Sequence, residues 1–185
     1  MSPIARSEIL DYVTYGEQRD QIRDSALRAK SVRRILVGEH FTFLFENRET
    51  VRYQIQEMMR IEQIVKEEDI QHELDTYNEL LHPEGPIGCT LMVGIDDEHE
   101  RDVKLQAWMG LNEHIYAKLQ DGTKVKPTWD PRQVGETRLS SVQYLSFTLG
   151  DMAPVAIGID MPGLELETEL SAAQRDALGQ DLGAE

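Results

Sequence analysis

The sequence predicts an α+β fold, in which an antiparallel sheet of about six to eight strands carries an antiparallel helix pair and shorter helices packed on it. Two observations support this prediction. Apolar residues recur at helical spacing in some segments and alternate at strand spacing in others. Strands and helices do not alternate regularly along the chain, which argues against a parallel sheet built from strand–helix–strand units.

The length of 185 residues, with 40% hydrophobic and 29% charged residues, fits one globular domain. We therefore expect a single domain over residues 1–185, in which residues 1–31 form a polar helical N-terminal arm. A short helix should begin at Ser7 and end at Gly16, and a second one should cover residues 17–31. This second helix is polar on nearly all sides, so it needs a surface to hold it.

Charge indicates what could hold the arm. Six basic residues against three acidic ones give residues 17–34 a net charge of +3, whereas the whole chain carries −15. The rest of the chain therefore carries −18. Either the arm pairs with acidic residues of its own chain, or it contacts an anion or a partner protein.

A β-hairpin should follow the arm. Its predicted strands, Arg33–Val37 and Phe41–Glu46, flank a turn at Gly38. The second strand places three of the chain's four phenylalanines on one face: Phe41, Phe43 and Phe45. We expect this face to lie in the core.

Two helices should come next. Asn47 is a suitable N-cap for the first, which continues to Val65, and the second should cover residues 69–81 and end before Pro83. The short link between them favours an antiparallel pair.

Glu62 is the most unusual residue of this pair, because it falls within the apolar stripe of the first helix: Val51, Ile55, Met58 and Val65. A buried carboxylate needs a cation, several hydrogen-bond donors or a metal. Gln54, on the same face, and Glu73, on the second helix, could join it. Either an arginine such as Arg48 or Arg60 satisfies these groups in a buried network, or they form a pocket for a ligand, a metal or a partner's side chain.

The remaining segments should add strands and two helices. We predict strands at Cys89–Ile95, His114–Leu119, Lys124–Thr128, Val142–Leu149, Val155–Asp160 and Leu164–Glu169. Asp121-Gly122 is typical of a type I′ turn between the second and third of these. Helices should cover residues 98–109 and the segment that Ser171 caps. The polar loop 129–141 is long enough to be either functional or mobile.

Composition and motifs argue against several classes of function. A net charge of −15 and a pI of about 4.7 argue against binding to nucleic acid or to an anionic membrane surface. No apolar run approaches 18 residues and no secretory leader starts the chain, so we expect a cytoplasmic protein with no membrane span. The only cysteine, Cys89, excludes an internal disulfide and is predicted to be structural. Phosphate loops, nucleophile elbows and His-Glu-x-x-His motifs are missing.

Several motifs together resemble an uncharacterised bacterial family of unknown function. They are Phe45-Glu46-Asn47-Arg48-Glu49-Thr50, Tyr53-Gln54-Ile55-Gln56-Glu57-Met58, Glu73-Leu74-Asp75-Thr76-Tyr77-Asn78, Leu139-Ser140-Ser141-Val142-Gln143-Tyr144-Leu145 and Gly158-Ile159-Asp160. Members of that family are encoded near rubrerythrin-like proteins and iron–sulfur oxidoreductases, so the resemblance implies a role in redox or peroxide metabolism. A histidine often follows the Gly-Ile-Asp motif in the family, whereas this chain has Met161 there.

We therefore predict a non-enzymatic accessory or binding protein of a redox system, whose partner is a rubrerythrin-like or iron–sulfur oxidoreductase protein. Six residues are predicted to line its binding surface: Arg48, Gln54, Glu57, Glu62, Glu73 and Tyr77. The alternative is an iron- or manganese-dependent enzyme that uses the buried carboxylates of the helix pair. We assign no metal ligands, because the Glu68 and His72 pair, although suitably spaced, lies on a solvent-facing side of its helix. The sequence leaves the cofactor unknown.

Overall fold

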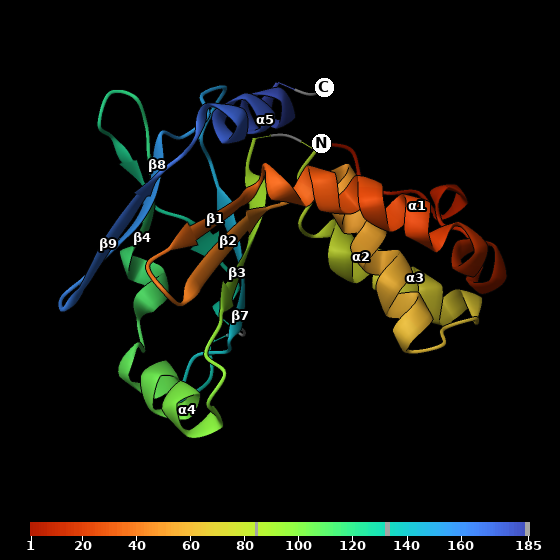
Figure 1. The fold of residues 1–185 in the computed structure, drawn as a ribbon, viewed down its shortest axis with the longest axis horizontal. Helices are drawn as coiled ribbons and strands as arrows, with labels where there is room; N and C mark the ends of the chain where they lie inside the picture. Colours follow the sequence, from red (N-terminus) through yellow and green to blue (C-terminus); the bar gives the residue numbers. More distant parts are fainter. Residues whose placement is uncertain (84, 132–133, 184–185) are drawn as a thin grey trace.

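A computed structural model describes residues 1–83, 85–131 and 134–183. The strands in these ranges form two antiparallel sheets (Figure 1). The five-stranded sheet has the order β1 (Arg34–Val37), β2 (Phe41–Phe45), β3 (Ile87–Val93), β7 (Val142–Phe147) and β6 (Thr128–Trp129). The four-stranded sheet has the order β5 (Lys124–Val125), β4 (Ile115–Lys118), β8 (Ala156–Met161) and β9 (Leu164–Glu169). The predicted α+β class is confirmed, and its antiparallel strands are divided between two sheets.

The helices in the described ranges are α1 (Tyr12–Ser31), α2 (Arg48–Ile61), α3 (Glu67–Asn78), α4 (Glu98–Ala107) and α5 (Ala172–Leu182). In Figure 1, α1, α2 and α3 lie on one side of the five-stranded sheet, and the four-stranded sheet lies on the other. Helices α4 and α5 lie at opposite ends of the sheets. Among the described residues, no helix has both the length and the apolar character needed to cross a membrane.

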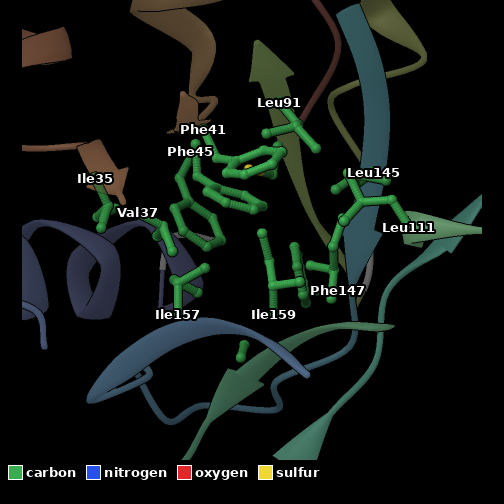
Figure 2. Close-up of a cluster of buried hydrophobic side chains, with 14 of the residues drawn as sticks. Ile35, Val37, Phe41, Phe45, Leu91, Leu111, Leu145, Phe147, Ile157 and Ile159 are labelled. Carbon is green, nitrogen blue, oxygen red and sulfur yellow. The ribbon is translucent and has the colours of Figure 1, made fainter. Parts of the chain in front are cut away.

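The main core lies between the two sheets (Figure 2). Phe41, Phe43 and Phe45 of β2 are at most 1% exposed, which confirms the predicted core face of the hairpin. The ring of Phe45 packs against Phe147 of β7 with centroids 5.7 Å apart. Ile157 of β8 faces them from the four-stranded sheet. Aromatic pairs of this kind stabilise a core beyond the effect of their buried area.

A second core forms among the helices, from Val51, Ile55 and Met59 of α2 and Ile70 and Leu74 of α3. Its stripe on α2 differs from the predicted one. The helix ends at Ile61, and Gln63 takes a left-handed φ of +55°, so the chain turns before it reaches Val65. The prediction that Val65 belongs to the buried stripe is therefore wrong, and its side chain is exposed.

The N-terminal arm contains one long helix. Asp11 caps α1 by accepting hydrogen bonds from the backbone N–H groups of Val13 and Thr14, whereas Ser7 lies in a short 3-10 turn. The predicted helix end at Gly16 is wrong, because a glycine inside a helix costs only about 1 kcal/mol. Packing of α1 against α2 offsets that cost.

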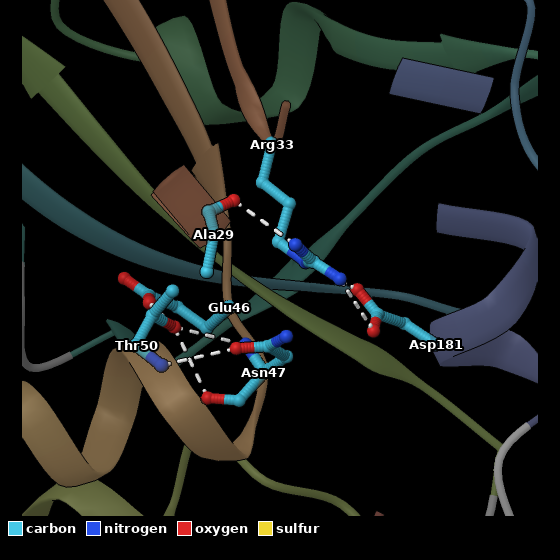
Figure 3. Close-up of polar contacts among 6 residues, drawn as sticks. All are labelled: Ala29, Arg33, Glu46, Asn47, Thr50 and Asp181. Carbon is cyan, nitrogen blue, oxygen red and sulfur yellow. Dashed lines mark hydrogen bonds and ion pairs between the residues drawn. The ribbon is translucent and has the colours of Figure 1, made fainter. Parts of the chain in front are cut away.

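Acidic residues of the same chain hold the arm in place. Arg19 donates two hydrogen bonds of 2.8 Å to the Glu57 carboxylate on α2. Arg33, which follows α1, donates two to Asp181 of α5, at 2.6 and 2.9 Å (Figure 3). The sequence left two possibilities for the arm: pairing with acidic residues of its own chain, or contact with an anion or a partner protein. The structure contains ion pairs of the first kind.

Two connections differ from prediction. Asp121-Gly122 joins β4 to β5, but only Gly122 of the two has a positive φ, and a type I′ turn requires a positive φ at both positions. The predicted strand Lys124–Thr128 is interrupted at Pro127, which has no N–H to donate to a sheet. Its first part joins the four-stranded sheet and its last residue joins the other. Residues 132–133 of the predicted loop 129–141 lie outside the described residues.

Cys89 is expected to resist thiol reagents in the folded protein. Its side chain is fully buried on the inner face of β3, and burial raises the pKa of its thiol well above the usual value. Because the thiolate is the reactive form, 5,5′-dithiobis(2-nitrobenzoate) should label Cys89 only after denaturation. Rapid labelling of the native protein would contradict a structural role.

Candidate functional site

A cleft separates the outer face of the five-stranded sheet from α1, α2 and α3. It consists of two adjoining cavities, of about 240 and about 320 Å3, which share the side chains of Tyr77, Leu80 and Tyr144. We call them the Glu46 cavity and the Trp129 cavity, after a residue that lines each one. Both volumes are of the order found in small-molecule sites. Tyr144 is 39% exposed, so the cleft is open to solvent.

Gly88 positions one wall of the cleft. A Cβ atom at this residue of β3 would lie 2.2 Å from the backbone oxygen of Leu80, which belongs to the connection after α3. Only glycine therefore allows this connection to lie directly on the sheet. The imidazole of His82 then reaches β7, where its Nε2 lies 2.8 Å from the hydroxyl of Ser146.

Glu46 supplies a buried carboxylate at one end of the cleft. Glu46 lies between the end of β2 and the start of α2 (Figure 3), and it is 7% exposed. The hydroxyls of Thr50 and Thr90 each donate a hydrogen bond to it. Burial raises the pKa of Glu46, although these two hydrogen bonds and the charges of Lys30 and Arg34 oppose the change.

Lys30 brings an amine to the same cavity from the last turn of α1. Its Nζ lies 5.1 Å from the centre of the Tyr53 ring, a cation–π distance. In the described ranges of the chain, neither a hydrogen bond nor an ion pair holds this nitrogen. Burial lowers the pKa of Lys30; the charge of Glu46 opposes this change and that of Arg34 adds to it.

Two of the residues predicted to bind a ligand line the cleft. Gln54 of α2 and Tyr77 of α3 both border the Glu46 cavity. Burial is the main cause that raises the pKa of Tyr77. Glu73 lies one turn before Tyr77, and both burial and the negative charge of Glu62 raise its pKa. The carboxylates of Glu62 and Glu73, which the sequence predicted to lie near each other, therefore interact electrostatically.

Glu62 itself is exposed, so the prediction that its carboxylate is buried is wrong. The physical reason is the early end of α2, which makes Glu62 the C-cap instead of an interior residue. The acid that α2 does bury is Glu57, whose carboxylate accepts hydrogen bonds from Arg19, Tyr15 and Arg60.

Glu57 and Arg48 make their contacts outside the cleft. The hydrogen bonds from Arg19, with smaller effects of Tyr15 and Arg60, lower the pKa of Glu57 to about 2. Arg48 instead binds the N-terminal segment, where its guanidinium donates to backbone oxygens of Ser2 and Pro3 and to Glu8. The predicted set therefore does not form one site. Two of its residues line the cleft, Glu57 lies in the seam between α1 and α2, Arg48 contacts the N-terminal segment, and Glu62 and Glu73 lie outside all three.

Sequence reasoning missed Glu46 and Lys30 as site residues. One signal for Glu46 was present, because it continues the outward-facing side of the hairpin strand after Thr42 and Leu44. That side would have been recognised as covered only if the position of α2 over the sheet had been known. Nothing in the local sequence distinguishes Lys30 from the other basic residues of the arm.

The described residues offer no ready metal centre, since they contain no group of three His, Cys, Asp or Glu side chains placed to hold an ion. Glu68 and His72 are both exposed on α3. The chemistry that the cleft does offer is that of a buried acid, an unpaired amine and aromatic walls.

The structure thus defines an α+β protein with a ligand-sized cleft between an antiparallel sheet and a layer of helices. The chain belongs to the family described as "Protein of unknown function (DUF3501)", whose pattern matches residues 3–182. A crystal structure of a novel protein of unknown function from Burkholderia pseudomallei K96243 is similar to it, with 28% sequence identity and a TM-score of 0.89. The match covers 98% of this chain and 100% of that one. No curated protein matches the chain.

Replacing Glu46 with glutamine is expected to raise the melting temperature at pH 8 and to leave it nearly unchanged at pH 4. The fold raises the pKa of Glu46, so its contribution to stability is complete below about 4.5 and is lost as the pH rises through the folded-state value. Glutamine resembles the protonated acid at every pH. A gain of about 1 kcal/mol corresponds to roughly 2–4 °C in a domain of this size.

Thermal unfolding of both proteins at the two pH values checks this expectation, with Glu17→Gln on the exposed side of α1 as the control. A clear fall in the melting temperature of Glu46→Gln at pH 8 would mean that the fold needs the negative charge. A gain would show that the chain keeps a carboxylate where a neutral residue is more stable, as functional sites commonly do.

Proposed function

We propose that this protein binds a small amphipathic organic anion in the cleft, and that it acts as an accessory or binding protein and not as an enzyme. The observation that carries the proposal is the Lys30 amine, which lies half-buried in a cavity with aromatic walls and no ion-pair partner in the described part of the chain. A half-buried ammonium with no ion-pair partner is unfavourable, and a ligand carboxylate would supply that partner.

The charges around the Glu46 cavity favour an anion over a cation. Lys30 and the exposed Arg34 both line it, against the single carboxylate of Glu46. Burial favours the neutral form of that carboxyl group, which repels an anion less and can donate a hydrogen bond to it. Arg34 can bind a carboxylate through two parallel hydrogen bonds.

The shared aromatic wall accounts for the apolar part of the ligand. Tyr77 and Tyr144 border both cavities, and Trp129 lines the second one. A ligand with its carboxylate at Arg34 and beside Lys30 would extend its aromatic or aliphatic body along these rings. Burial of such a body contributes roughly 25 cal/mol for each Å2 of apolar surface removed from water.

Titration calorimetry with 3-phenyllactate tests the proposal, with phenethylamine as a cation of similar size. We expect the anion to bind and Lys30→Gln to weaken it about tenfold or more, which corresponds to about 1.4 kcal/mol. The matched control is Lys118→Gln on the four-stranded sheet, where Lys118 pairs with Glu167. Equal binding by wild type and Lys30→Gln, or tighter binding of the amine, would argue against an anion site.

The cellular role that goes with this site is supported by the motif resemblance alone, which implies a redox or peroxide-metabolism system. A rubrerythrin-like or iron–sulfur oxidoreductase protein would then be the partner. Co-purification of the untagged protein with such an oxidoreductase tests this role. Stoichiometric iron or manganese in the purified protein would instead favour the metal-dependent enzyme.

A further inference from the structure

We infer that the Lys30 amine captures a carbonyl group of the bound anion as a reversible imine, so that the ligands of the cleft are 2-oxo acids with an apolar body. This inference rests on the proposed anion site and adds a covalent step to it. The step is a form of binding, since it releases the ligand unchanged when the imine is hydrolysed.

The position of Lys30 provides the first argument. Lys30 lines a cavity of about 240 Å3, and among the described residues only the ring of Tyr53 is placed to hold its Nζ. Most of the other lysines in the described ranges are tied to partners: Lys104 to Glu100, Lys118 to Glu167, Lys124 to Asp160 and Lys126 to the backbone oxygen of Glu113. Lys66, in contrast, is exposed before α3. Lys30 therefore combines an unpaired amine with a ligand-sized space.

The surroundings of Lys30 favour its nucleophilic form. Only a neutral amine attacks a carbonyl group, and enzymes obtain it by burying a lysine or by placing a second cation beside it. Both conditions hold here, because burial and the charge of Arg34 lower the pKa of Lys30. Glu46 and Glu57 act in the opposite direction, but burial is the largest cause.

The chemistry needs only groups that line the cavity. The Lys30 nitrogen forms a bond to the carbonyl carbon, and the π electrons of the carbonyl move to its oxygen, which takes up one proton from the nitrogen. The carboxyl group of Glu46 then protonates the hydroxyl, the C–O bond breaks, and water leaves as the nitrogen lone pair forms the C=N bond. The nitrogen returns a proton to Glu46. Amine and carbonyl become imine and water, with no oxidant or reductant.

Arg34 explains why the carbonyl would belong to an oxo acid. It lines the same cavity as Lys30 and comes from the neighbouring β1. A carboxylate held by Arg34 would place an adjacent carbonyl carbon near the Lys30 nitrogen. An aldehyde without a carboxylate lacks this contact and should be captured less well.

Reductive trapping with phenylpyruvate and sodium cyanoborohydride at pH 7 tests the inference. Cyanoborohydride converts an imine to a stable secondary amine, so we expect a mass increase of one reduced ligand per chain and a peptide map that places it at Lys30. Phenyllactate, which has a hydroxyl in place of the carbonyl, should bind without any adduct. Lys30→Arg should abolish the adduct, and Lys118→Arg should retain it.

The wild-type protein alone gives a second readout that does not depend on a variant's folding. Lys30 should carry at least ten times more label than the exposed Lys66. Equal labelling of the two, or labelling that persists in folded Lys30→Arg, would overturn the inference. Binding of phenyllactate with no adduct from phenylpyruvate would overturn the imine and leave the anion site standing. Failure of both ligands to bind would overturn both proposals.

Discussion

Replacing Gly88 with alanine is expected to destabilise the protein by about 3 kcal/mol, the upper end of the usual range for overpacking. The new Cβ would lie 2.2 Å from the Leu80 backbone oxygen and 3.0 Å from its carbonyl carbon. These are backbone atoms, so no side-chain rotation relieves the contact. The connection after α3 must move away from β3, and urea-induced unfolding measures the cost.

The same substitution should also alter the cleft, because Leu80 and Tyr77 line both cavities. We expect weaker binding of 3-phenyllactate at a temperature where the variant is still folded. Gly94→Ala is the matched control. A Cβ at Gly94 meets nothing closer than the His40 backbone oxygen at 4.0 Å, so that variant should remain within about 0.5 kcal/mol of wild type. Similar unfolding midpoints for Gly88→Ala and Gly94→Ala would contradict the close packing described here.

Local signals predicted most of the elements correctly. Asn47 and Ser171 cap α2 and α5 because each side chain accepts a hydrogen bond from a backbone N–H three residues later. The alternation of Phe41, Phe43 and Phe45 predicted the core face of β2, because side chains two residues apart in a strand lie on the same face. Each of these features depends only on residues that are near one another in the sequence.

Features that depend on distant contacts were not predicted. Strands β7 and β8 join different sheets, and nothing within the sequence of either strand indicates which sheet it joins. The stripe on α2 was displaced because the position of the helix end, at Ile61, could not be read from propensity alone. Glu57 is buried by a different contact, in which Tyr15 and Arg19 of α1 donate hydrogen bonds to it, and the sequence of α2 does not reveal that contact.

The candidate site shows the same division. Gln54 and Tyr77 were found because helical spacing places them on faces that turn toward the sheet. Lys30 and Glu46 were missed because the cavity exists only when α1, α2 and β2 come together. A site built from three segments has no signature in any one of them.

Replacing Glu57 with glutamine is expected to destabilise the protein by about 3 kcal/mol at pH 7, near the lower end for the loss of one member of a buried ion pair. Glu57 is 9% exposed and accepts hydrogen bonds from the Tyr15 hydroxyl at 2.6 Å and from Arg19 at 2.8 Å. Tyr15 is 1% exposed, so its hydroxyl would lose a charged acceptor in a site that water does not reach. The Arg19 side chain keeps 29% exposure, which limits the cost.

The difference between wild type and Glu57→Gln should shrink in acid. The fold lowers the pKa of Glu57 from 4.5 to about 2, so its contribution is complete above about 4.5 and is lost as the pH falls toward 2. Urea unfolding at pH 7 and at pH 3 measures the difference directly. Glu100→Gln, which removes a partly exposed pair with Lys104, should cost at most about 0.5 kcal/mol. A Glu57→Gln penalty as small as that of Glu100→Gln would mean that apolar packing alone joins α1 to α2. An equal penalty at both pH values would mean that the charge of Glu57 does not stabilise the contact between α1 and α2.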